Sequence, residues 1–275
     1  ANVIRTQKDL SMKIIAFGSI FTILLIPVIP ILLGAGNYLS NLDLLKSGWY
    51  SYWTQVTLFY ATFFFAPLIG AYCAFLWRYE NFNSCRNTLF ACPVSYHTIY
   101  LSKFILVCAI SGLTQIWFAL LFFASGKVIG LPGLPPGDLC FWMIRGLAGA
   151  FVIAALQFLV ATEIRSFATP IAVGLAGGVT GIIAANTKAG LLWPYSQMLL
   201  GMNSNKSEDV LGQNTVLFFV ICAVYLLGVS LTGIGRIKNT IGDISYNNEG
   251  AGSPFLGFRH SSAFTSALYP AISFL

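Results

Sequence analysis

The sequence predicts an all-α, polytopic membrane protein with six transmembrane helices. Of its 275 residues, 57% are hydrophobic and only 9% are charged, and the mean hydropathy is +0.77. Soluble globular proteins carry roughly 25% charged residues, so this composition places the chain in a lipid bilayer. The apolar residues are gathered in stretches of about 20, which is the length that a helix needs to cross the hydrocarbon core.

Six apolar segments meet that length, and together they define one transmembrane domain over residues 1–235. The expected spans are residues 14–33, 53–77, 104–123, 139–161, 167–185 and 215–234. Pro27 and Pro30 are expected to kink the outer half of the first span, because proline removes a helix hydrogen bond. This first run is too long for a signal peptide and lacks a small-residue cleavage site, so we expect it to stay in the membrane. Residues 236–275 are expected to form a cytoplasmic tail of unknown role.

The basic residues predict the orientation of these spans. With the amino terminus inside, the inner segments hold Arg5, Lys8, Lys13, Arg78, Arg86, Lys103, Arg165, Arg236, Lys238 and Arg259. The outer loops then hold only Lys46, Lys127, Lys188 and Lys206. Because short cytoplasmic loops are enriched in Lys and Arg, both termini are predicted to be cytoplasmic. The net charge of +6 suits anionic lipid headgroups, and we expect no nucleic-acid partner.

The sequence lacks the motifs of an enzyme or an ATPase. It contains no GxxxxGK[ST] phosphate loop, no HExxH and no GxSxG. Its two histidines, His97 and His260, are far apart, and no CxxC pair occurs, so no metal site is expected. We therefore expect no catalysis and no cofactor on this chain. Uphill transport would need energy from a partner or from an ion gradient.

Three polar side chains fall inside the expected spans. Arg145 lies about 9 Å deep in the fourth span at 1.5 Å per residue. It is interpreted either as an arginine that snorkels to the outer interface or as a possible substrate contact. Gln115 and Gln157 are interpreted as interhelical hydrogen-bond partners or as possible substrate contacts. No carboxylate lies in any expected span, so a proton relay is not expected.

Four glycines in the fifth span have overlapping four-residue spacings. The pairs are Gly174 with Gly178 and Gly177 with Gly181. Small residues at this spacing let two helices approach closely. We therefore expect a close helix contact, within or between subunits, near a central pathway.

The polar segment, residues 78–103, separates the second and third spans and is far longer than a hairpin turn requires. A short helix is expected from Glu80 up to Pro93, because proline disfavours a helix before it. Asn83, Arg86 and Asn87 share one face of this helix. The segment is either an interfacial amphipathic helix or a docking helix for a soluble partner.

Several short motifs carry a family resemblance. Trp53 and Gln55 open the second span, Phe65-Ala66-Pro67-Leu68-Ile69 lies within it, and Glu80-Asn81 follows. Cys92-Pro93-Val94-Ser95 and Ser102-Lys103 then precede the third span. With these motifs the chain resembles the type-2 ABC export permeases and, among them, the lantibiotic and bacitracin self-immunity branch. The likeness is densest over residues 53–123.

The resemblance implies a six-helix permease subunit that pairs with a second permease subunit, identical or sister. Two separate ABC ATPase chains would bind ATP and Mg²⁺. Residues 80–88 of the polar segment would form the coupling helix that rests on the ATPase, and residues 191–200 would match short re-entrant helices. The implied cargo is an amphipathic antimicrobial peptide expelled at the bacterial plasma membrane. The alternatives are another cargo, such as a lipid, a drug or an ion, and an ATP-independent sensor or scaffold.

Overall fold

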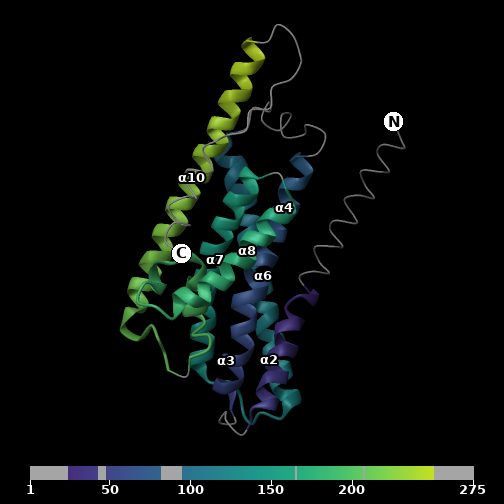
Figure 1. The fold of residues 1–275 in the computed structure, drawn as a ribbon, viewed down its shortest axis with the longest axis vertical. Coiled ribbons are helices and arrows are strands. Elements are labelled where there is room, and N and C mark those ends of the chain that lie inside the picture. The colour runs from purple at the N-terminus through teal and green to yellow at the C-terminus, as the bar shows by residue number, and fades with distance from the viewer. Residues whose placement is uncertain (1–23, 43–47, 82–94, 165, 207, 251–275) are drawn as a thin grey trace, which may run out of the picture. The chain divides into compact units, whose positions relative to one another are not determined.

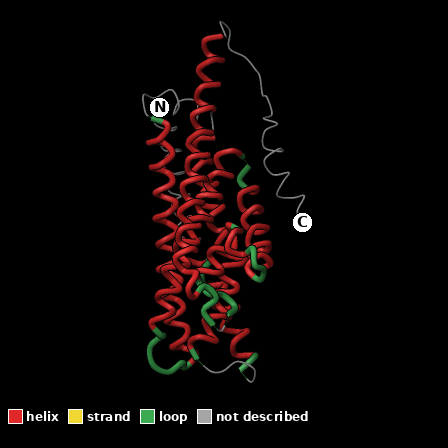
Figure 2. Tube along the Cα trace, turned by 90° about the vertical axis from the view of Figure 1, so that its left-hand side faces the viewer, coloured by secondary structure: helices red, strands yellow, loops and turns green. Residues whose placement is uncertain are grey.

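The computed structural model describes residues 24–42, 48–81, 95–164, 166–206 and 208–250. Ala1–Lys238 form one compact unit and Asn239–Leu275 a second, and the packing described below belongs to the first. In the described segments the regular structure is helical, without strands (Figure 2). This agrees with the predicted all-α class.

The longer helices follow one another along the chain with short connections (Figure 1). They are α2 (Val28–Ser40), α3 (Trp49–Phe59), the π-helix η1 (Tyr60–Phe64), α4 (Phe65–Asn81), α6 (Tyr96–Ile129), α7 (Gly137–Glu163), α8 (Ala168–Ala185) and α10 (Thr215–Gly250). Four shorter ones follow α8: η2 (Gly190–Leu192), η3 (Pro194–Ser196), α9 (Gln197–Gly201) and η4 (Gly212–Asn214).

Five described helical stretches are long and apolar enough to cross a membrane. They are Trp49–Trp77, Tyr96–Ile129, Gly137–Glu163, Ala168–Ala185 and Gly212–Asn239. These stretches cover the second to sixth predicted spans. Most of the first predicted span, residues 14–33, lies outside the described residues. Its described part turns at Ile26–Pro27 before α2 begins, which fits the expected break at proline.

The predicted start of the third span needs correction. It was placed at Phe104, whereas α6 already begins at Tyr96, directly after Ser95, and runs on to Ile129. An apolar run marks only the part of a helix that lies in lipid. Backbone hydrogen bonding continues through the polar residues before it, so the helix is longer than the apolar run.

The second span is the most enclosed of the five. Its apolar window is 61% buried, whereas the windows of α6, α8 and α10 are only 22% to 28% buried. Within the first unit, α4 packs on α7 and α8, while α2 packs on α3. The outer faces of α6 and α10 remain aliphatic, which suits contact with lipid. Their exposed residues include Ile105, Leu113, Ile116, Leu120, Val216, Val220, Val224, Leu227 and Leu231.

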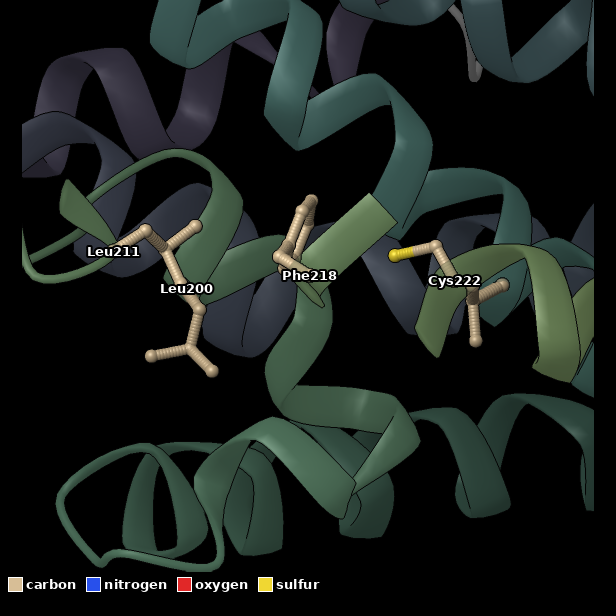
Figure 3. Packing of buried hydrophobic residues seen from close by; sticks show 5 residues of the cluster. Leu200, Leu211, Phe218 and Cys222 are labelled. Atoms are coloured by element: carbon tan, nitrogen blue, oxygen red, sulfur yellow. The ribbon is translucent and has the colours of Figure 1, made fainter. Parts of the chain in front are cut away.

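A small apolar cluster anchors the start of α10. Val152 on α7, Leu200 on α9 and Leu211 pack with Phe218 and Cys222 on α10. Figure 3 shows Phe218 between Leu200 and Cys222 in this cluster. Burial of these side chains holds the short helices before α10 against α7.

Candidate functional site

The centre of the second span is a π-helix. Proline at position 67 has no amide hydrogen to bond the carbonyl oxygen of Phe63, and η1 ends just before this position. Such local widening of a helix is frequent at functional sites. Tyr60 at its start is fully buried and stacks on Phe118 of α6, with 3.8 Å between the ring centroids. The distortion therefore lies where the second span meets α6.

Gln115 is buried beside this π-helix and links three parts of the chain. Its Oε1 accepts a hydrogen bond of 3.1 Å from the Tyr60 hydroxyl. Its Nε2 lies 3.0 Å from Sδ of Met143 on α7 and 3.7 Å from Sδ of Met202 after α9. Gln115 thus occupies an interhelical position, which is one of the two roles expected for it. Its role in contacting substrate remains a prediction.

Gln157 on α7 is a second buried amide that joins helices. Its nitrogen donates to the Pro170 carbonyl oxygen at 2.9 Å, and its oxygen accepts from the Gly174 N–H at 3.1 Å and from the Tyr195 hydroxyl at 3.2 Å. Pro170 and Gly174 belong to α8, and Tyr195 belongs to η3. These contacts satisfy an amide that would be costly to leave unpaired in an apolar environment.

The four glycines of α8 face two different neighbours. A Cβ on Gly178 would lie 1.8 Å from the Thr62 carbonyl oxygen of η1, and one on Gly174 would lie 2.7 Å from the Ala66 carbonyl oxygen of α4. Thr62 and Ala66 have the same four-residue spacing as the glycines. The two backbones are therefore in direct contact within one chain.

The other glycine pair receives η3 on the opposite side. A Cβ on Gly177 would lie 2.5 Å from the Tyr195 ring, and one on Gly181 would lie 2.7 Å from the Tyr195 carbonyl oxygen. All four positions are buried. A close helix contact within the chain thus accounts for both spacings, while their place near a transport pathway remains a prediction.

The three short helices before the loop to α10 form the insert, residues 190–201. All five residues of α9 are buried. Gly149 on α7 makes room for α9, because a Cβ there would lie 2.5 Å from the Gln197 carbonyl carbon. Trp53 of α3 donates from its indole nitrogen to the Met202 carbonyl oxygen at 2.7 Å. Short packed helices thus occupy the region where the resemblance implied re-entrant helices.

Arg145 is fully buried and ends in an ion pair. Its Nη1 and Nη2 donate to the two carboxylate oxygens of Asp209 at 3.0 and 2.8 Å. Its Nε donates to the Gly201 carbonyl oxygen at 3.3 Å, and Nη1 also donates to the Thr215 hydroxyl at 3.3 Å. The guanidinium reaches the loop before α10, as snorkelling requires, but it meets protein groups there. A role in substrate contact remains a prediction.

Asp209 is the partner that sequence reasoning missed. Its partial burial raises the pKa of the carboxyl, but the hydrogen bond and the charge of Arg145, with the amides of Leu211 and Gly212, lower the pKa further. The net result is a pKa below 3.8, so the carboxylate is ionised at neutral pH. The one available signal was a lone arginine in a span followed by an acidic residue in a later loop on the same side.

The coupling residues lie mostly beyond the described part of the chain. Asn83, Arg86, Asn87 and Pro93 all fall in residues 82–94, and their predicted helix is therefore untested. Glu80 belongs to the last turn of α4.

The ends of the two helices beside that gap are described. The ammonium of Lys103 on α6 lies 4.9 Å from the ring centroid of Trp77 on α4. This contact joins the helices that border the polar segment. Among the described residues, no three His, Cys, Asp or Glu side chains are grouped to hold a metal ion.

Comparison with protein families gives one match. A family model described as "ABC-2 family transporter protein" matches residues 12–181, which is more than half of the chain. The match includes the second span, the polar segment, both buried glutamines and the glycines of α8. It ends before the insert and α10. Comparisons with curated proteins and with solved structures give no match.

Proposed function

Because this chain belongs to the ABC-2 family of transporter proteins, we propose that it is a permease subunit that expels an antimicrobial peptide of the lantibiotic or bacitracin type. The family match carries the coarser part of this statement: the chain is a multi-pass membrane permease that works with an ABC ATPase. The peptide cargo, the immunity role and the details of coupling are the proposal.

The polar segment is proposed as the contact with the ATPase. It joins α4, which continues to Asn81, to α6, which begins at Tyr96. The two helices are thus long levers that extend from the polar segment into the apolar core. In the proposal, Glu80, Asn83, Arg86 and Asn87 present the docking surface, and Pro93 ends it.

Movement at the polar segment would reach the core through the second span. α4 packs on α7 and α8, and the π-helix above it contacts α6 through the Tyr60–Gln115 hydrogen bond. The ATPase would supply the energy by hydrolysing ATP with Mg²⁺ on its own chain. A push on α4 would then shift α6, α7 and α8 together and rock this subunit against a second permease subunit.

The cargo is proposed from the character of the surface. The outward faces of α6 and α10 are aliphatic over their length, with Ile116 and Leu231 among the most exposed residues. Such surfaces favour an amphipathic peptide that enters from the bilayer over a polar solute. A lipid or a drug would meet the same surface, so cargo identity depends on the transport experiment.

The function is tested by protection of a sensitive bacterium. The chain is produced with the ABC ATPase encoded beside it, and growth inhibition is measured for a panel of lantibiotics and for bacitracin. We expect several-fold protection that disappears when the ATPase cannot hydrolyse ATP. Protection against none of these peptides would contradict the proposed cargo and leave the permease assignment standing.

The coupling role is tested separately with a double variant. Glu80→Ala with Arg86→Ala should weaken copurification of the ATPase and lower transport-coupled ATP hydrolysis at unchanged expression. The matched control is Lys188→Ala with Glu208→Ala, which removes one exposed charge of each sign at a distance from the polar segment. Equal ATPase binding by the two double variants would refute the docking role.

A further inference from the structure

A hollow of about 340 Å³ opens between α3, the end of α8 and the loop after α9. Its floor is apolar and includes Leu58, Ile182, Leu199 and Leu200. Leu58 lies about 14 Å along the helix axis from Trp49, at a rise of 1.5 Å per residue. The hollow therefore leads from the loop down into the membrane-spanning part of the bundle.

The rim of the same hollow is polar and carries a cation. It is formed by Asn186 at the end of α8 and by residues 203–206 of the following loop. The ammonium of Lys206 donates to Asn186 Oδ1 at 2.9 Å. In the described part of the chain no carboxylate pairs with this ammonium. Since an ammonium has three donors, Lys206 retains hydrogen-bonding capacity toward an anion.

Ser204 supplies an independent sign of a ligand. Its side chain lines the hollow and the residue is only 7% exposed. Its hydroxyl has no hydrogen-bond partner among the described residues. Buried hydroxyls are nearly always satisfied, because an unpaired one is costly. A group that accepts from Ser204 and from Lys206 together would satisfy both donors.

An apolar stripe on α8 leads to this rim. Leu175, Val179, Ile182 and Asn186 are spaced four, three and four residues apart, so they lie on one face of the helix. Leu175 and Val179 are 47% and 40% exposed. Their side chains end at the hollow, because Ile182 and Asn186 both line it. The stripe thus offers aliphatic contact below a cationic rim.

We propose that this hollow binds the phosphate of an anionic lipid, with an acyl chain along the α8 stripe. The phosphate oxygens accept from the Lys206 ammonium and the Ser204 hydroxyl, and the glycerol and upper methylenes pack on Leu58 and Ile182. Free phosphate has the same headgroup chemistry, but it would leave the apolar floor and stripe uncovered. The inference concerns lipid binding alone and does not rest on the proposed cargo.

The test uses the full purified chain in detergent and three soluble probes. Binding is measured by calorimetry for dihexanoyl phosphatidylglycerol, for dihexanoylglycerol, which lacks phosphate, and for inorganic phosphate. We expect phosphatidylglycerol to bind at least about tenfold more tightly than either other probe. Equal binding of phosphatidylglycerol and dihexanoylglycerol would overturn the phosphate contact. Phosphate binding as tightly as phosphatidylglycerol would assign the site to a free anion and overturn the lipid.

Variants locate the site. Lys206→Ala should weaken phosphatidylglycerol binding by roughly fivefold, the usual effect of one lysine at an anionic surface, while Lys188→Ala, an exposed lysine outside the hollow, should leave it unchanged. Val179→Glu should weaken phosphatidylglycerol without affecting inorganic phosphate. Each variant must keep the thermal midpoint of the ligand-free chain, and Ser204→Ala provides a conservative second variant of the rim. Equal effects of the two lysine variants would refute the site.

Discussion

Arg145 in α7 and Asp209 in the loop before α10 form a two-pronged ion pair, with N–O distances of 3.0 and 2.8 Å. The arginine side chain is 0% exposed and the carboxylate side chain 37%. Because Arg145 also bonds the Gly201 carbonyl and the Thr215 hydroxyl, it joins α7, the insert and the start of α10. The pair closes one end of this part of the bundle.

Removal of the carboxylate should therefore destabilise the chain. Asp209→Asn leaves a guanidinium buried beside a neutral amide, and breaking a buried pair costs roughly 3–5 kcal/mol. Asp209 is partly exposed, so we expect a smaller loss of about 2 kcal/mol. The measurement is unfolding by sodium dodecyl sulfate in mixed micelles. Glu208→Gln, a neighbouring exposed carboxylate, is the control, and an equal effect of both changes would show that the pair is not stabilising.

The same pair predicts an acid-sensitive stability. The pKa of Asp209 is lowered below 3.8 in the folded chain, since the contribution of Arg145 outweighs that of partial burial. A carboxylate with a depressed pKa stabilises above its unfolded pKa, and this stabilisation is lost as the pH falls through the folded value. The thermal midpoint should respond little to this group from pH 5 to 8 and fall below about pH 4. Asp209→Asn should remove this acid-dependent part, and an unchanged slope would contradict the assignment.

The contact between α8 and η1 predicts a steric effect. A Cβ on Gly178 would lie 1.8 Å from the Thr62 carbonyl oxygen, and neither backbone can move without displacing a helix. Gly178→Ala should cost about 1–3 kcal/mol, as overpacking does. Gly112→Ala in α6 is the matched control, since nothing lies within 4 Å of its added Cβ. That change should be neutral or slightly stabilising, and equal effects would refute the close contact.

The sequence predicted the spanning helices well because lipid thickness sets the length of their apolar runs. The ends of α6 were misplaced because helix hydrogen bonding does not stop where apolar residues stop. Polar and small residues inside spans were recognised correctly as unusual positions, since the bilayer offers them few other partners. Gln157 and Gly178 both proved to lie at contacts between helices.

The partners of those residues could not be read from the sequence. Asp209 lies 64 positions from Arg145, and nothing local indicates that its loop returns to α7. Likewise, Pro67 announces a disturbed helix but does not specify a π-helix that brings Tyr60 onto Gln115. Pairings of this kind depend on how the chain folds back, which periodicity and composition do not encode.

The hydrogen-bond junction at Gln157 gives the last prediction. Gln157→Leu keeps a similar side-chain size but removes contacts to the Pro170 carbonyl, the Gly174 N–H and the Tyr195 hydroxyl. Interhelical hydrogen bonds in membranes contribute about 0.6 kcal/mol on average and at most about 1.7. With three partners left unpaired, we expect a loss of about 1–2 kcal/mol in mixed-micelle unfolding, together with looser packing of η3 on α8. Gln213→Leu, at an exposed position in η4, should leave stability unchanged. If the two leucine variants unfold alike, the amide does not hold α7, α8 and η3 together.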